Sequence, residues 1–205
     1  MDTYSNFDEL ANNEKEGEDF TIDFRRADPN VAVVAIHGGG IEPGTAEIAD
    51  AVAGTTYTYY AFKGLKKKGN RVLHINSHRY DEPQGVRTSQ AAWVILSIHG
   101  CREKNETVFV GGRNRELRQR VISSLRSAGF FAVASEIPGQ RGVSEHNICN
   151  RCRSGRGVQL EISRGLRDKM YEDLERRRVR TRMPLFHLFV QCLRMALEGT
   201  SVQAL

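Results

Sequence analysis

The chain has 205 residues, of which 40% are hydrophobic and 27% charged, with a formal net charge of +5. This length suits one well-buried α/β domain and is short for two, so we expect a single domain over residues 1–205. No run approaches the roughly 18 uncharged apolar residues of a membrane span, and the first residues lack the basic and apolar regions of a signal peptide. We therefore expect no membrane partner and a cytoplasmic protein with four reduced cysteines.

The charge is distributed unevenly along the chain. Residues 1–30 carry nine acidic and three basic side chains, whereas residues 151–205 carry six acidic and twelve basic ones. A basic half indicates a polyanionic partner, either a nucleic acid or an acidic polymer, unless its arginines only form the solvated face of a helix. Residues 1–19 are predicted to be an acidic N-terminal arm with a short helix, anchored by Phe7 and Leu10.

The first half of the chain reads as strands separated by one helix and by turns. The predicted order is an edge strand at 20–25, a buried strand at 31–37, a helix at 45–53, a strand at 57–62, a turn at 66–71, a strand at 71–76 and a turn at 81–83.

The second half alternates strands and helices around one long loop. The predicted order is strands at 93–99 and 107–110, a helix at 116–128, a strand at 130–134, a loop at 139–157, a strand at 157–163, an arginine-rich helix at 169–182 and an apolar helix at 184–197. Such alternation indicates a mostly parallel sheet in three layers. A long loop in a compact domain is usually functional.

Two histidines are placed in the same way, each at the end of an apolar run and before a glycine. His37 follows residues 31–36, and His99 follows residues 93–98. Side chains that end parallel strands meet at the carboxyl edge of the sheet, where open α/β folds bind ligands. Glu42 follows His37 by five residues, on a glycine-rich loop able to fold it back. Two histidines and one glutamate are the ligand set of a catalytic zinc site, although either histidine alone could be a partly buried residue bonded to a loop.

Zinc hydrolysis of an amide also needs a carboxylate to take a proton from water and a cation for the oxyanion. Glu161 is the candidate base, because the strict alternation of residues 157–163 directs its side chain away from the apolar face. For the oxyanion the candidates are Arg113 or an arginine of the 151–164 cluster. Glu161 could instead be a surface carboxylate, and Arg113 could pair with a neighbouring acid. His74 and His78 are rival metal ligands of lower rank, since the turn at 81–83 places them in a wall of the site.

Seven blocks of the sequence together resemble one known family. The blocks are His37-Gly-Gly-Gly-Ile-Glu-Pro-Gly-Thr-Ala-Glu47, Leu73-His-Ile-Asn-Ser, Asp81-Glu-Pro, Ile98-His-Gly-Cys, Val110-Gly-Gly-Arg, Asn147-Ile-Cys-Asn-Arg151 and Gly157-Val-Gln-Leu-Glu-Ile-Ser-Arg-Gly-Leu-Arg167. In this order they resemble the phage and bacterial poly-γ-glutamate hydrolase family, and the similarity runs from about Tyr4 to Arg167.

The resemblance implies a fold, a site and an activity. The family is similar to zinc carboxypeptidases, with an α/β/α sandwich around a mixed, mostly parallel sheet. His37, Glu42 and His99 would then be zinc ligands and Glu161 the general base. The five-residue step from His37 to Glu42 departs from the three-residue step of carboxypeptidases proper. The implied activity is endo-type cleavage of γ-glutamyl amide bonds in poly-γ-glutamate.

A polyanionic substrate needs several cations in its cleft, and bidentate arginine pairing would select it. The arginines expected beside the site are those at 113, 151, 153, 156, 164 and 167. The substrate-binding candidates are Asn147, Asn150, Arg151, Arg164 and Arg167. We expect a monomer, released by cell lysis if it is phage-encoded.

Two alternatives stay open. One is a zinc hydrolase of small N-acyl amino acids, which would use the same site. The other is a basic nucleic-acid-binding module, against which stand the strand-end histidines and the absence of a recognised nucleic-acid motif.

Overall fold

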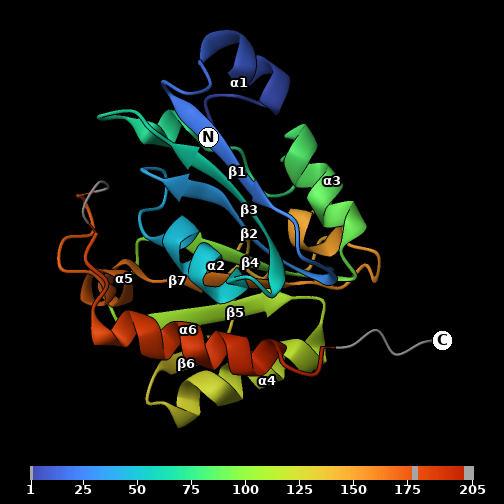
Figure 1. The fold of residues 1–205 in the computed structure, drawn as a ribbon, viewed down its shortest axis with the longest axis vertical. Helices are drawn as coiled ribbons and strands as arrows, with labels where there is room; N and C mark the ends of the chain where they lie inside the picture. Colours follow the sequence, from blue (N-terminus) through green and yellow to red (C-terminus); the bar gives the residue numbers. More distant parts are fainter. Residues whose placement is uncertain (1, 177–179, 201–205) are drawn as a thin grey trace.

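A single seven-stranded sheet runs through the molecule, in the order β1-β3-β2-β4-β7-β5-β6 (Figure 1). The computed structural model describes residues 2–176 and 180–200. The strands are β1 (Phe20–Arg25), β2 (Asp28–Gly39), β3 (Tyr57–Gly64), β4 (Val94–Gly100), β5 (Thr107–Gly112), β6 (Phe131–Ala134) and β7 (Val158–Ile162). The α-helices are α1 (Phe7–Asn13), α2 (Thr45–Ala53), α3 (Pro83–Ala91), α4 (Arg115–Ser127), α5 (Arg164–Met170) and α6 (Pro184–Leu197), and 3-10 helices lie at Asn70–Leu73 and Ile148–Asn150.

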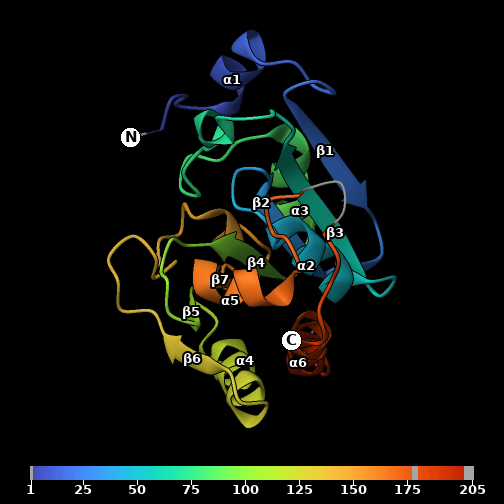
Figure 2. The same cartoon turned by 90° about the vertical axis from the view of Figure 1, so that its left-hand side faces the viewer.

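Helices cover both faces of this sheet, which gives three layers (Figures 1 and 2). The side chains of α2, α4, α5 and α6 share one apolar core with alternate residues of the central strands. A second core on the opposite face contains residues of α1 and of the 3-10 helix at 148–150, with α3 packed against it. The predicted α/β/α sandwich around a mixed sheet is therefore confirmed.

The direction of the strands decides which loops meet. Strands β3, β2, β4 and β7 are parallel, so their carboxyl ends share one edge of the sheet. Strand β1 is an antiparallel edge strand, as the alternation of residues 20–25 predicts. Strands β5 and β6 are parallel to each other but antiparallel to β7. The loops that leave β5 and β6 therefore start at the opposite edge from those that follow β2, β4 and β7.

The pleat of the strands then selects the face on which polar side chains lie. On β4, Leu96 and Ile98 belong to the core under α2 and α6, so Ser97 and His99 point to the other face. On β7, Leu160 likewise points into that core, and Gln159 and Glu161 point away from it. Four polar side chains of neighbouring strands therefore share one face of the sheet.

Most predicted elements are present, and the helices at 45–53 and 184–197 have the predicted bounds. The strand at 71–76 is wrong, because residues 70–73 form a 3-10 helix followed by irregular chain. The turn at 81–83 is in fact the start of α3. Glu82 caps that helix by accepting hydrogen bonds from the amides of Gln84 and Gly85, and Pro83 takes the first helical position, where no donor is needed.

The arginine-rich helix at 169–182 is also wrong in its described part. Helix α5 begins after Ser163, whose side chain accepts from the amide of Leu166, and it ends at Met170. Tyr171 is extended and forms a β-bridge with Arg182, so the chain turns back toward α6. Residues 177–179 of that prediction lie outside the described residues.

Candidate metal centre

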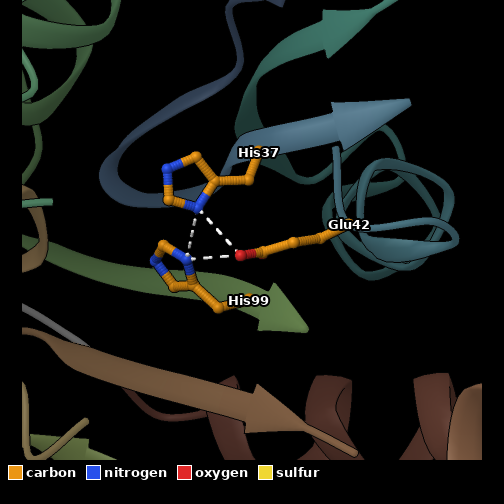
Figure 3. A group of neighbouring side chains, drawn as sticks. All are labelled: His37, Glu42 and His99. Carbon is orange, nitrogen blue, oxygen red and sulfur yellow. Dashed lines mark hydrogen bonds and ion pairs between the residues drawn. The ribbon is translucent and has the colours of Figure 1, made fainter. Parts of the chain in front are cut away.

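Two strands and one loop bring His37, Glu42 and His99 together at the carboxyl edge of the sheet (Figure 3). His37 lies near the end of β2 and His99 near the end of β4. The loop after β2 turns back on itself, and the amide of Glu42 donates to the carbonyl of His37 over 2.8 Å. Gly39 permits this turn, because its φ is +67° and a Cβ there would lie 2.4 Å from the carbonyl oxygen of Gly64.

The three side chains present their electron pairs to one another. His37 Nδ1 lies 3.1 Å from Glu42 Oε1 and 3.2 Å from His99 Nδ1, and His99 Nδ1 lies 3.6 Å from Glu42 Oε2. All three residues are buried, with 2%, 8% and 2% of their surfaces exposed. Within the described part of the chain, this is the group of three ligand-type side chains close enough to share a metal ion.

The outer hydrogen bonds of the histidines favour metal binding on the inner side. His37 Nε2 lies 2.8 Å from the carbonyl of Ile75, which can only accept, so Nε2 donates and Nδ1 is the nitrogen that faces the other candidate ligands. His99 Nε2 lies 2.9 Å from Ser97 Oγ, which can play the same part. Glu42 Oε2 accepts from the amide of Gly100 over 2.8 Å. Each candidate ligand is thus oriented by a second partner.

The charge of Glu42 depends on its neighbours. Burial alone would raise its pKa, but the charges and hydrogen bonds of His37 and His99 outweigh burial and hold the pKa well below the ordinary value. A buried carboxylate facing two imidazole nitrogens requires a cation or a proton between them. A set of two nitrogens and one carboxylate matches the donor preference of zinc, so the residues present fit such an ion.

Glu161 lies directly beside this group, because β4 and β7 pair in parallel with His99 opposite Glu161. Gln159 Nε2 donates to Glu161 Oε1 over 3.0 Å, and Asn147 Nδ2 donates to Gln159 Oε1 over 2.9 Å. Burial, followed by the charge of Glu42, raises the pKa of Glu161 to about 8. A carboxyl group with a pKa near neutrality is suited to proton transfer.

A cleft of about 410 Å³ opens over these residues. Its lining residues come from β2, β4, β7 and the segments that connect the elements: His37, Glu42, Arg71, His74, Asn76, Ser77, His78, His99, Gly100, Cys101, Arg102, Gly139, Gln140, Asn147, Gln159 and Glu161. An adjoining cavity of about 220 Å³ shares Glu42, Arg71, Gly100, Cys101 and Arg102 with it and also contains Arg164 and Arg167. The site is therefore a groove that continues past the metal centre.

The rival histidines line the cleft without joining the ligand group. The ring of His74 stacks on that of His37, with 3.9 Å between centroids. Its Nδ1 lies 2.7 Å from Asp2 Oδ1, and its Nε2 lies 4.0 Å from Glu42 Oε1. Burial, helped by the charge of His37, lowers the pKa of His74 to about 4. His78 is an exposed residue of the cleft wall.

Three of the five substrate-binding candidates lie at the groove. Asn147 lines the cleft, and Arg164 and Arg167 line the adjoining cavity. Arg164 pairs with Asp168 and Glu175, over 2.7 Å in both cases. Arg167 is buried and donates to three backbone carbonyls, those of Pro43, Cys101 and Ile162. Arg167 thus ties the loops after β2 and β4 to the end of β7.

The structure places Asn150, Arg151 and Arg113 away from the groove. The side chain of Asn150 is buried and bonds to backbone groups of its own loop. The Arg151 guanidinium donates to the carbonyl of Tyr80, a buried residue of the second core. Arg113 is exposed at the end of β5 and does not line the cleft, because that antiparallel strand ends beside the start of β7. The expected role of Arg113 near the metal site is therefore corrected.

The expected cluster of arginines is only partly present for a similar reason. The loop at 139–157 begins at the cleft and then runs to the other edge of the sheet, where the amide of Arg153 bonds to the carbonyl of Ala92. The guanidinium of Arg153 lies over the ring of Trp93. Arg71 and Arg102 line the cleft instead. The position of Arg102 three residues after His99 could have predicted its place at the site. Arg71 offered no such signal, because residues 71–76 were predicted to form a strand.

Two further observations concern the cysteines and the helices. All four cysteines are free, including Cys149 and Cys152. None of the helices formed by residues 2–176 and 180–200 has the length and hydropathy to cross a membrane.

Comparison with known proteins identifies the family. The sequence model of the poly-gamma-glutamate hydrolase family matches residues 4–192. UPF0714 protein YndL of Bacillus subtilis (strain 168) is 39% identical over 171 residues, which are 83% of this chain and 67% of YndL. UPF0714 protein YmaC of the same organism is 34% identical over 200 residues, which are 96% of this chain and 84% of YmaC.

Two solved structures have the same fold, each at 35% sequence identity and a TM-score of 0.91. One is a bacteriophage poly-gamma-glutamate hydrolase, with 96% of both chains covered. The other is the zinc-free apo form of YndL, with 97% of this chain and 98% of that chain covered. Since the match extends over sequence and fold alike, the chain belongs to the poly-gamma-glutamate hydrolase family.

Proposed function

We propose that this protein is a zinc-dependent hydrolase that cleaves γ-glutamyl amide bonds within poly-γ-glutamate. The observation that carries the proposal is the convergence of His37 Nδ1, His99 Nδ1 and the Glu42 carboxylate beside Glu161, at the floor of an open groove. The family supports the same activity. We also propose that the protein is a cytoplasmic monomer, released by lysis if a phage encodes it; its four unpaired cysteines are consistent with a reducing compartment.

His37, Glu42 and His99 would hold the zinc ion. Such an ion acts as a Lewis acid that makes water acidic and polarises an amide carbonyl, and its charge favours ionised Glu161. Ile75 and Ser97 keep the histidine rings turned toward the ion through their contacts with Nε2. Arg167 holds the loop that carries Glu42 through its bond to the carbonyl of Pro43. The ligand set is therefore rigid before any ion binds.

Glu161 would take the proton from the attacking water. Its Oε1 is occupied by the amide of Gln159, so Oε2 is the oxygen that accepts the proton. As the C–N bond breaks, the same carboxyl group can give the proton to the nitrogen, which leaves as an amine. Gln159 and Asn147 act as positioning residues, because Gln159 donates to the carboxylate and is itself held by Asn147.

Metal analysis of the purified protein tests the site. We expect about one zinc per chain in the wild type and little in His37→Ala and His99→Ala, since loss of one of three ligands weakens such a site sharply. His187→Ala is the matched control, because His187 is exposed on α6. Undiminished zinc in both ligand variants would contradict the assignment.

An activity assay separates the substrate classes. The wild type should shorten poly-γ-glutamate and should leave N-acyl amino acids intact. Cleavage of the small amide with an intact polymer would replace this proposal by the small-substrate alternative.

A further inference from the structure

Poly-γ-glutamate repeats one arrangement of groups at every bond. The γ linkage joins the side-chain carbonyl of one unit to the α-nitrogen of the next, so the carbon next to each scissile nitrogen bears a free α-carboxylate. In an ordinary peptide this arrangement exists only at the last residue. An enzyme that cleaves the γ-linked polymer must therefore accept an anion immediately beside the reacting amide, at every position along the chain.

Two arginines of the groove are available for such an anion. Arg71 and Arg102 line both the main cleft and the adjoining cavity, as Glu42 does. Both side chains are exposed. Among residues 2–176 and 180–200, neither guanidinium has an ion pair or hydrogen bond, whereas Arg164 is paired with Asp168 and Glu175. The acidic residues that line the groove with them are Glu42 and Glu161, which belong to the metal site.

The segments that carry Arg71 and Arg102 lie close to the candidate metal ligands. Arg102 follows His99 by three residues, on the segment that leaves β4. Arg71 lies in the 3-10 helix at 70–73, and the next residue after that helix is His74, whose ring stacks on His37. The two guanidinium groups thus reach the groove from separate parts of the chain. Guanidinium groups bind carboxylates through two parallel hydrogen bonds, which selects this anion over neutral groups.

We propose that Arg71 and Arg102 bind the α-carboxylates of the glutamyl units that flank the scissile bond; this rests on the proposed function. Each internal unit of the polymer then offers a free α-carboxylate beside the amide, which in a peptide only the last residue offers. Because the groove continues past the metal centre into the adjoining cavity, the rest of the chain can leave on both sides. Recognition of a terminal-type carboxylate thereby becomes compatible with internal cleavage.

The test compares Arg71→Gln, Arg102→Gln and the double variant on two substrates. The substrates are poly-γ-glutamate and the same polymer with its α-carboxylates methyl-esterified. On the acidic polymer we expect the KM to rise about fivefold in each single variant, as for a solvent-exposed ion pair, and by roughly the product in the double variant, with kcat nearly constant. On the esterified polymer the KM values of variants and wild type should converge.

Arg115→Gln is the matched control, because Arg115 is exposed at the start of α4, at the other edge of the sheet. Its KM should equal that of the wild type, and all variants should retain zinc. Unchanged KM values in the two groove variants, or equal losses on both substrates, overturn this inference while leaving the proposed function intact. Failure of the zinc-loaded wild type to cleave the polymer at all overturns the proposed function, and that result does not depend on the variants.

Discussion

The carboxylates of Glu42 and Glu161 share one cleft but have opposite electrostatic settings. The neighbouring histidines hold the pKa of Glu42 well below its usual value, against the effect of burial. Burial and the charge of Glu42 raise the pKa of Glu161 to about 8. Two carboxyl groups whose pKa values are pushed apart are suited to different tasks. Glu42 stays anionic as a ligand, and Glu161 can exchange a proton.

Replacing Glu161 by glutamine should abolish most turnover without unfolding the protein. Glutamine keeps the shape of the side chain and removes the proton acceptor, and a positioned general base contributes about 10²–10⁴-fold to the rate. The measurements are kcat on the polymer, zinc content and the circular dichroism spectrum. Near-normal turnover in a folded, zinc-loaded Glu161→Gln protein would remove Glu161 from the mechanism.

In the presence of a chelator, we expect the free energy of unfolding of the wild type, compared with that of Glu161→Gln, to depend on pH. An unfolded glutamate ionises near 4.5, whereas folded Glu161 ionises near 8, so the folded state binds more protons between these values. The stability that this group contributes is present below the lower value and is lost as the pH rises through the upper one. Denaturant unfolding should therefore show Glu161→Gln gaining on the wild type from about pH 5 to about pH 8. A constant difference would show that burial does not hold the proton on Glu161.

At the scale of elements, the segment before α1 supports part of the cleft wall from outside. The Asp2 carboxylate accepts from His74 Nδ1 over 2.7 Å, from the amide of Asn76 over 2.8 Å and from Arg79 over 3.0 Å. A second tie joins the amide of Phe7 to Asp81 over 2.7 Å. The irregular chain at 74–81 is thus held by residues more than seventy positions earlier. Burial opposes ionisation of Asp2, but its hydrogen bonds lower the pKa.

Asp2→Asn should therefore reduce activity although Asp2 lies outside the ligand group. The amide can replace only part of the three hydrogen bonds, and loss of such a partner by a largely buried group costs about 1–3 kcal/mol. We expect kcat/KM on the polymer to fall about tenfold with normal zinc content. Asp8→Asn is the control, since Asp8 is exposed in the first turn of α1. Equal activity of the two variants would show that the wall needs no support from Asp2.

The elements also show which features local sequence can reveal. The helix at 184–197 was predictable because its apolar residues recur at helical spacing, and Glu161 was predictable because residues 157–163 alternate strictly. Helix α3 could not be predicted from local sequence, because it is largely polar and its cap, Glu82, is recognisable only in the folded structure. The direction of β5 leaves no local trace, because parallel and antiparallel neighbours bury the same residues. That direction alone moves Arg113 from the site to the opposite edge.

At the scale of the whole molecule, the chain has a formal net charge of +5, and the exposed Arg71 and Arg102 line its groove. The ligand trio was predictable because each histidine ends a buried strand, and parallel strands deliver such residues to one edge. The cations were harder to predict, because arginines abound in the second half and only the path of each loop decides which of them reach the groove. Arg153 and Arg102 illustrate the two outcomes.

Cleavage of the polymer should weaken with salt, because exposed charges more than a Debye length apart are screened, and that length falls from about 10 Å at 0.1 M to about 3 Å at 1 M. We expect the KM to rise with ionic strength, and size-exclusion chromatography should show early products of broad, intermediate length. Release of single glutamate units from an otherwise full-length polymer would contradict internal cleavage.

The pairing of His99 with Glu161 across β4 and β7 has a consequence for redesign. The spacing between ligand and base is set by the hydrogen bonds of two neighbouring strands, whereas Arg71 and Arg102 sit outside the strands, on a 3-10 helix and on the segment that follows β4. Exchanging the side chain at position 71 and the segment at 102–106 for others would alter what the groove accepts, while the histidine ligands and Glu161 stay on their strands and the Ile75 carbonyl still holds His37. The sheet is thus a fixed scaffold for the reaction, and the segments around the groove can change the substrate that it accepts.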